Sequence, residues 1–381
     1  MRAIALSLGL AAVALLAAAC GAVDETPAAG DARSTFDAYT CDGDIAVMAP
    51  YGGDSDTDYV QMNWARVALD RFNREHGTAF TLMPSNVDYD YNKSAKEARR
   101  IVANPNVIAV VGPKTSSATE TAGPVFDRAG LAYVSPSATN AALTDGHLRH
   151  FYRVVASDAL QAPRMASFVA DDLDPEGVLV VQDNEPYSKG LGDAVFQQLA
   201  SRDIDVDRIQ VEVEQESYSD VVTRVTPGVD VVVAPLLVPD DARRMVEELH
   251  AAGKYPTIVG GDALFVNAFD VPGAYVTTYA PDISRYPGGR EIIRLYQSIF
   301  GDFESFGGPA YVAMQVVLTA ALDVCERDQE VTRSAVTEEI PNVRLEESIL
   351  NMPIAFDERH ELEGATINVY RVGPTGYDLV G

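Results

Sequence analysis

The stretch VIAVVGPKTSSATETAGPVFDRAGLAYVSPSATN, residues 107–140, contains the same pattern twice. An apolar run of strand type (107–111, then 131–135) passes directly into a loop of Gly, Pro, Ser and Thr (112–116, then 135–140). Both runs are continuous rather than alternating in hydrophobicity, which is typical of parallel strands covered on both faces. The stretch therefore predicts two parallel strands of an α/β sheet, each ending in a hydroxyl-rich loop.

The same unit, a short strand followed by a turn and an amphipathic helix, recurs along most of the chain. This alternation predicts doubly wound α/β sheets, and two sheets are expected because 381 residues is long for one core. Ligands of open parallel sheets lie beyond the carboxyl ends of the strands, so two facing sheets would form a cleft. The predicted strands are 44–49, 107–111, 131–135, 178–182, 229–234 and 257–260, and the predicted helices are 59–76, 93–103, 117–129, 158–172, 188–201, 240–252, 287–300 and 309–324.

The two hydroxyl-rich loops have the chemistry of an anion site. Ser116 lies at the start of a predicted helix, where unpaired N–H groups and the helix dipole favour negative charge. Ser137 and Thr139 follow the neighbouring strand, so both loops together could hold a carboxylate. Ser and Thr are equally ordinary as turn and helix-capping residues, and these positions alone favour neither interpretation.

The second half of the chain offers the complementary chemistry. Tyr187 and Asp262 each follow a predicted strand, at the carboxyl end that faces the cleft. An acid can bind an ammonium group, and a tyrosine can cover an apolar side chain. The alternatives are a helix cap for Asp262 and a packed rim residue for Tyr187. A carboxylate site on one lobe and an ammonium site on the other describe an α-amino acid.

Residues 1–20, MRAIALSLGLAAVALLAAAC, indicate an export signal, with a membrane-spanning helix as the alternative. The small residues before Cys20 resemble a bacterial lipoprotein processing site, which predicts a lipid on Cys20 and a tether over 21–42. The remaining cysteines, Cys41 and Cys325, are a candidate disulfide in an oxidising compartment. Cys41 precedes the first strand, and Cys325 ends a helix that should run antiparallel to it, so both belong at the pole away from the cleft if that helix packs on the first lobe. The alternative is two unpaired thiols.

Charge and missing motifs exclude several function classes. Removing Arg2 with the signal takes the net charge from −27 to −28, which argues against nucleic-acid binding. The chain lacks a dinucleotide fingerprint, a Gly-x-Ser-x-Gly elbow and a His-Glu-x-x-His motif, so we expect neither a cofactor nor catalysis. Asp54, Asp56 and Asp58 have the spacing of the first EF-hand ligands, but the Gly and Glu of that loop are replaced by Tyr59 and Ala65. We therefore expect no metal site.

Six segments resemble, in order and spacing, the type I periplasmic solute-binding proteins of the leucine/isoleucine/valine-binding family. They are VIAVVGPKTSSAT, AGLAYVSPSATNAALT, FYRVVASDALQAPRMASFV, VLVVQDNEPYSKGLGDAV, GKYPTIVGGDALF and PAYVAMQVVLTAALDV, and the similarity extends over 43–381. The resemblance implies two Rossmann-like lobes joined by three crossovers, near 153–157, 279–284 and 342–349. The expected N-terminal lobe is 43–155 plus 281–342, and the C-terminal lobe is 156–280 plus 343–381.

Family members deliver amino acids to an ABC importer, so the resemblance implies a lipid-anchored monomer on the outer face of the cell membrane that serves permease and ATPase subunits. If the roles of the matching family residues are transferred to this sequence, Ser116 and Thr139 would bind the ligand carboxylate. The Ser137 carbonyl, with Ala138 beside it, and Asp262 would bind the ammonium group, and Tyr187 would cover the ligand. A branched-chain amino acid is the leading ligand.

Three departures from the family pattern leave other ligands open. The loop 50–59 is acidic, Lys114 lies within the carboxylate loop, and Leu237 occupies a place that is often aromatic. The alternative functions are a receptor of the same fold that senses an amide or other polar solute through a partner, and a metal-dependent enzyme that uses Asp54, Asp56 and Asp58.

Overall fold

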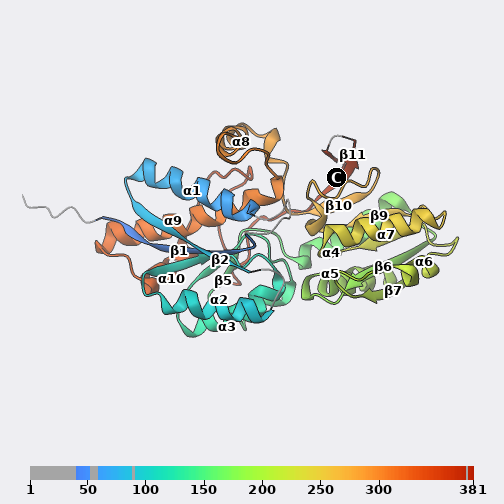
Figure 1. Ribbon diagram of the computed structural model, residues 1–381, viewed down its shortest axis with the longest axis horizontal. Coiled ribbons are helices and arrows are strands. Elements are labelled where there is room, and N and C mark those ends of the chain that lie inside the picture. Colours follow the sequence, from blue (N-terminus) through green and yellow to red (C-terminus); the bar gives the residue numbers. More distant parts are fainter. Residues whose placement is uncertain (1–39, 52–58, 88–90, 375) are drawn as a thin grey trace, which may run out of the picture. The chain divides into compact units, whose positions relative to one another are not determined.

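The computed structural model describes residues 40–51, 59–87, 91–374 and 376–381 (Figure 1). Its first sheet has the strand order β2-β1-β3-β4-β5, and all neighbouring strands are parallel. This is the order of a doubly wound sheet, with its topological switch point between β1 and β3. The strands are β1 (Asp42–Ala49), β2 (Ala79–Asn86), β3 (Val107–Val111), β4 (Tyr133–Ser135) and β5 (Phe151–Arg153).

The second sheet repeats this winding. Its parallel strands have the order β7-β6-β8-β9-β10, and β11 and β12 extend it with antiparallel pairing. The strands are β6 (Gly177–Asp183), β7 (Asp205–Val211), β8 (Val231–Ala234), β9 (Thr257–Gly260), β10 (Tyr275–Thr278), β11 (Asn368–Gly373) and β12 (Gly376–Leu379). We call the part built on β1–β5 the first lobe and the part built on β6–β12 the second lobe. The predicted fold of two doubly wound lobes is confirmed.

Helices cover both faces of each sheet, and separate apolar clusters fill the two sides. In the first lobe, α1, α8, α9 and α10 contribute to one side, and α2 and α3 to the other. In the second lobe, α4 and α5 pack on one side, and α6 and α7 on the other. The helices are α1 (Val60–His76), α2 (Tyr91–Ala103), α3 (Ser116–Arg128), α4 (Asp158–Ser167), α5 (Pro186–Ala200), α6 (Ser219–Arg224), α7 (Pro239–Ala251), α8 (Pro287–Phe300), α9 (Gly308–Asp328) and α10 (Arg333–Glu339).

Helix α9 is the core helix of the first lobe. The stretch Ser305–Asp328 is long and apolar enough to cross a membrane, but 78% of its apolar window is buried inside the fold. It packs against α1 and β3, which lie far from it in the sequence (Figure 1). Near its end, Cys325 is bonded to Cys41, which stands just before β1. The disulfide therefore lies at the amino end of the first strand.

The chain passes between the lobes three times. Val154 packs in the first lobe and Val155 in the second, and the return lies between Ala280 and Ile283. The third connection differs from the expected 342–349. Residues 345–362 turn back on themselves through the bridges Leu345–Ile354 and Phe356–Leu362, and their apolar side chains fill the first core. The expected boundary at 343 is therefore wrong, because the passage to the second lobe comes after residue 362.

Candidate ligand-binding site

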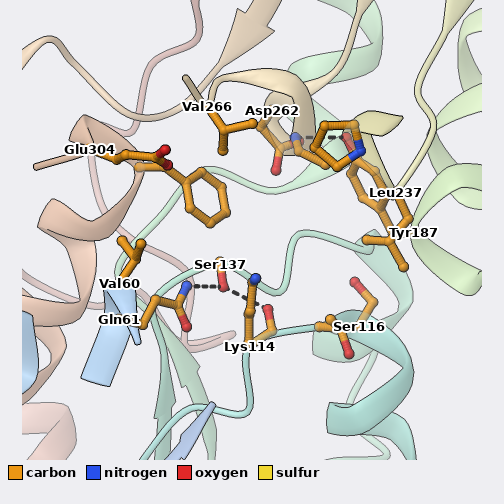
Figure 2. A pocket seen from close by; sticks show the side chains of 14 residues that line it. Val60, Gln61, Lys114, Ser116, Ser137, Tyr187, Leu237, Asp262, Val266 and Glu304 are labelled. Carbon is orange, nitrogen blue, oxygen red and sulfur yellow. Dashed lines mark hydrogen bonds between the residues drawn. The ribbon is translucent and has the colours of Figure 1, made fainter. Parts of the chain in front are cut away.

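A pocket of about 620 Å³, including space open to solvent, lies at the carboxyl ends of strands from both sheets. Figure 2 shows Asp262 and Val266 across the pocket from Ser116, Ser137 and Lys114. Both lobes therefore contribute to one site, as expected for facing parallel sheets. The lining residues are Val60, Gln61, Lys114, Thr115, Ser116, Ser137, Tyr187, Leu237, Pro239, Asp262, Ala263, Val266, Glu304 and Phe306.

The loop after β3 leads directly into the amino end of α3. Gly112 has φ +112°, and a Cβ there would lie 2.5 Å from the carbonyl oxygen of Met48, so the position requires glycine. Thr115 caps the helix, since its hydroxyl accepts the N–H of Ala118 at 3.1 Å. Ser116 is the first helical residue, lines the pocket and is 2% exposed. The loop thus presents the first turn of α3 to a ligand, which suits an anion.

The loop after β4 is held against the loop after β3 by two serine hydroxyls. Ser135 donates to the carbonyl oxygen of Pro113 at 2.7 Å, and Ser137 donates to that of Lys114 at 2.6 Å. The Ser137 hydroxyl also accepts the Nε2–H of Gln61 at 2.7 Å. Because this hydroxyl is engaged within the protein, Ser137 stabilises the wall of the pocket.

Ala138 and Thr139 are fully buried and lie behind the pocket wall. The N–H of Ala138 donates to Ser135 Oγ at 2.9 Å and its carbonyl accepts from Arg153, so both backbone groups are engaged within the first lobe. Neither residue is among those that line the pocket, and the ligand contacts expected at Ala138 and Thr139 stay predictions. The hydroxyl of Thr139 has no hydrogen-bond partner among the described residues.

Arg153, the last residue of β5, holds the loop after β4 in place. Its guanidinium is fully buried and donates to the carbonyl oxygens of Ala138 at 3.1 Å and Asn140 at 2.9 Å. The same guanidinium forms a bidentate ion pair with Glu361, 208 residues further along the chain. Sequence reasoning missed this pair, since no local pattern relates an arginine in a strand to a glutamate in a distant turn.

The second lobe contributes Tyr187 from the first turn of α5 and Asp262 from the short helix after β9. The Tyr187 hydroxyl accepts the N–H of Ala263 at 3.4 Å, and a Cβ on Gly261 would lie 2.3 Å from that hydroxyl oxygen. Glycine at 261 therefore allows the ring to lie beside Asp262. Burial raises the pKa of Asp262 to about 7, partly offset by the side chains of Tyr187 and Gln161.

Asp183, the last residue of β6, fixes two loops of the second lobe. Its carboxylate accepts the N–H of Glu185 at 2.9 Å and the N–H of Leu237 at 2.8 Å. Burial nevertheless raises the pKa of Asp183 to about 6, while these two N–H groups act in the opposite direction. Asp183 thereby connects the loop that carries Tyr187 with the loop that carries Leu237.

The rest of the pocket combines an apolar wall with two charged side chains. Val60, Leu237, Val266 and Phe306 supply the apolar surface. Lys114 and Glu304 also line the pocket, so its wall is not purely apolar outside the Asp262 site.

Several predicted features lie outside the described residues: Cys20, the signal and most of the tether, and Asp54, Asp56 and Asp58. Within the part of the chain that the structure describes, no group of three His, Cys, Asp or Glu side chains could hold a metal ion. His147 contacts Asp145 on the surface.

A family model described as "Periplasmic binding protein" matches residues 44–376. The chain belongs to this family. A curated relative, the Leu/Ile/Val-binding protein BraC3 of Rhizobium johnstonii, is 28% identical over 268 residues, which cover 67% of this chain and 72% of the relative. The name of this relative describes a binding protein.

Solved structures show the fold of this periplasmic binding protein. The leucine-binding protein LivK from Thermotoga maritima superposes with a TM-score of 0.78 at 20% identity, covering 89% of this chain and 98% of that one. LivJ from Streptococcus pneumoniae, solved in complex with isoleucine, superposes with a TM-score of 0.76 at 19% identity, covering 88% and 99%. The family expected from the sequence is therefore confirmed.

Proposed function

We propose that this periplasmic binding protein binds a free α-amino acid between its lobes, with branched-chain amino acids as the leading ligands, and delivers it to the permease of an ABC importer. The main support for this proposal is that Ser116, at a helix amino terminus, and the buried Asp262 on the opposite lobe line the same pocket. The first group suits a carboxylate and the second an ammonium group.

In this proposal the ligand carboxylate binds Ser116 and the amino end of α3, with Thr139 nearby. The ammonium group binds Asp262 and the carbonyl of Ser137, and Tyr187 covers the ligand. The apolar wall of Val60, Leu237, Val266 and Phe306 supports an aliphatic side chain. The name of the Rhizobium relative and the isoleucine in the pneumococcal structure support the same ligand class.

Closure of the lobes follows from this division of contacts. Each lobe satisfies one charged end of the ligand, so the ligand binds the closed form more tightly and shifts the population towards it. We further propose that residues 1–20 direct export, that Cys20 carries a lipid, and that the monomer presents the closed form to the permease and its ATPase subunits. No nucleic acid takes part.

Calorimetric titration of the ligand-stripped chain with each standard amino acid tests the proposal. We expect saturable binding of at least one aliphatic amino acid, and a weaker complex with Ser116→Ala. Ser334→Ala, an exposed serine on α10, serves as the matched control and should bind like wild type. Binding of a solute without an α-amino group, with no response to any amino acid, would refute the proposed ligand class.

A further inference from the structure

Asp262, which lines the pocket, belongs to a group of buried oxygen atoms that have no hydrogen-bond partner among the described residues. Both lobes contribute, and electrostatic coupling joins the members, since Asp158 and Asp262 each affect Tyr279, and Gln161 acts on Asp262. We call this group the acidic chamber. Its members are Thr139 Oγ1, Asp158 Oδ1 and Oδ2, Gln161 Oε1, Asp262 Oδ1 and Tyr279 Oη.

The chamber is rich in acceptors and poor in donors. Carboxylate and amide oxygens can only accept hydrogen bonds, so among the member atoms only the two hydroxyls can donate. The side chains of Tyr187 and Gln161 act as further donors, but towards Asp262. Gln161 Nε2 donates to the carbonyl of Thr277 at 3.0 Å, and the Gln161 side chain also stabilises the charged form of Asp262, so the lack of donors falls on Asp158, whose two oxygens have no partner among the described residues. The Thr139 hydroxyl stabilises the charged form of Asp158, although the pair does not reach hydrogen-bonding geometry.

The charges around Asp158 do not cancel. The groups that face it from other elements are Asp262, Thr139, Arg153, Glu361, Tyr187 and Tyr279. The positive charge of Arg153 is matched by its bidentate partner Glu361. Asp158 and Asp262 therefore share the chamber without a cation of their own among the residues that face them.

Two carboxyl groups in such surroundings resist ionisation. Burial, and then the neighbouring charge of Asp262, raises the pKa of Asp158 to about 8. Burial raises the pKa of Asp262 to about 7. The two groups titrate as a coupled pair, which keeps part of its protons at neutral pH in the ligand-free protein.

We propose that Asp158 is a second carboxyl of the ammonium site, and that a ligand enters the acidic chamber in exchange for a proton. This inference rests on the proposed function and deepens it. A primary ammonium group brings one positive charge and three N–H donors to a chamber that lacks both. Its arrival favours the ionised carboxylates, so the displaced proton passes to solvent and the ligand N–H groups replace the carboxyl O–H.

Two pH effects follow. Proton release makes amino-acid affinity rise with pH, towards about tenfold per pH unit where a full proton is released. In the ligand-free protein the sign is opposite. A carboxyl with a raised folded pKa stabilises the fold less as pH rises from its unfolded value of about 4 towards about 8.

Melting temperatures of the ligand-free chain between pH 5 and 8.5 test the chamber without a ligand. Asp158→Asn removes the ionisable group, so its melting temperature should improve relative to wild type as pH rises. Asp241→Asn is the control, because Asp241 is equally buried on α7 but accepts the N–H of Glu214. It should show the same dependence on pH as wild type. Parallel curves for Asp158→Asn and wild type would overturn the proposal.

Calorimetry with leucine at pH 7, in two buffers of different ionisation enthalpy, then counts the protons released. Wild type should release close to one proton, and Asp158→Asn should still bind leucine but release less than half as much. If leucine binds wild type without proton release, the inference fails and the proposed function stands. If no amino acid binds, the proposed function fails, and the melting series alone decides whether the chamber exists.

Discussion

The side-chain amide of Asn140 donates a hydrogen bond from Nδ2 to the carbonyl oxygen of Pro186 at 2.6 Å. Asn140 belongs to the loop after β4, and Pro186 is the first residue of α5, so this bond joins the two lobes beside the pocket. The Oδ1 atom of the same amide accepts the N–H of Ala142 at 2.9 Å, which fixes the direction of the amide. The Asn140 side chain thus connects the first lobe directly to α5 of the second lobe.

Asn140→Asp should weaken ligand binding about three- to tenfold, which corresponds to a net hydrogen bond of about 1 kcal/mol. The aspartate keeps the oxygen that caps the turn at Ala142 but cannot donate to Pro186, so the loss falls on the bond between the lobes. Calorimetry measures the change, and small-angle scattering should show a larger open fraction. Unchanged affinity would mean that this bond does not contribute to closure.

Gly261→Ala should weaken binding by about 1–3 kcal/mol, because a methyl group at 261 would lie 2.3 Å from the Tyr187 hydroxyl oxygen and force that side chain to move. Gly228→Ala is the matched control in the same lobe, since nothing lies within 4 Å of a Cβ there. Titration with the same amino acid compares the two. Equal affinities in both variants would show that the position of Tyr187 is unimportant.

Arg153→Met should lower the free energy of unfolding by about 3–5 kcal/mol, because it leaves Glu361 without its buried partner. Arg71→Met removes a more exposed ion pair with Glu75 and should cost about 1 kcal/mol or less. Denaturant titration measures both. The double variant Arg153→Met/Glu361→Leu should recover part of the loss, and a double variant as unstable as the single one would count against this explanation.

Replacing Cys41 and Cys325 by serine should lower stability by about 2–5 kcal/mol, since the disulfide spans 284 residues and restricts the unfolded chain. Ligand affinity should stay the same, because the bond lies at the amino end of β1 and the pocket lies at the carboxyl ends of the strands. Thermal melting and calorimetry on the same sample separate the two effects. A large loss of affinity in the folded variant would contradict this placement.

The central strands could be predicted from the sequence, whereas the edge strands could not. Strands β3 and β6 are buried at every position, so they appear as continuous apolar runs. Strands β2 and β7 lie at the edges of the parallel part of each sheet and mix exposed and buried residues, so they lack that signal. The third connection was misplaced because residues 343–362 are held by isolated bridges and not by a long periodic element.

The site could be predicted to the level of its loops. Ser116, Tyr187 and Asp262 follow strands, and the rule that ligands lie at carboxyl ends places them in one pocket. The orientation of Ala138 depends on Ser135 and Arg153, and the position of Asp158 beside Asp262 depends on how the lobes meet. These are tertiary relationships between distant residues, which local sequence patterns do not encode.

The most direct test of the account compares the tightest-binding amino acid with its deamino analogue, in wild type and in Asp262→Asn. If Asp262 binds the ammonium group, wild type should prefer the amino acid by at least about 2 kcal/mol, or roughly thirtyfold. Asp262→Asn should reduce that preference to less than about tenfold, mainly by weakening the amino acid complex. An undiminished preference in Asp262→Asn would contradict the central claim that this pocket recognises an amino acid through opposite charges on its two lobes.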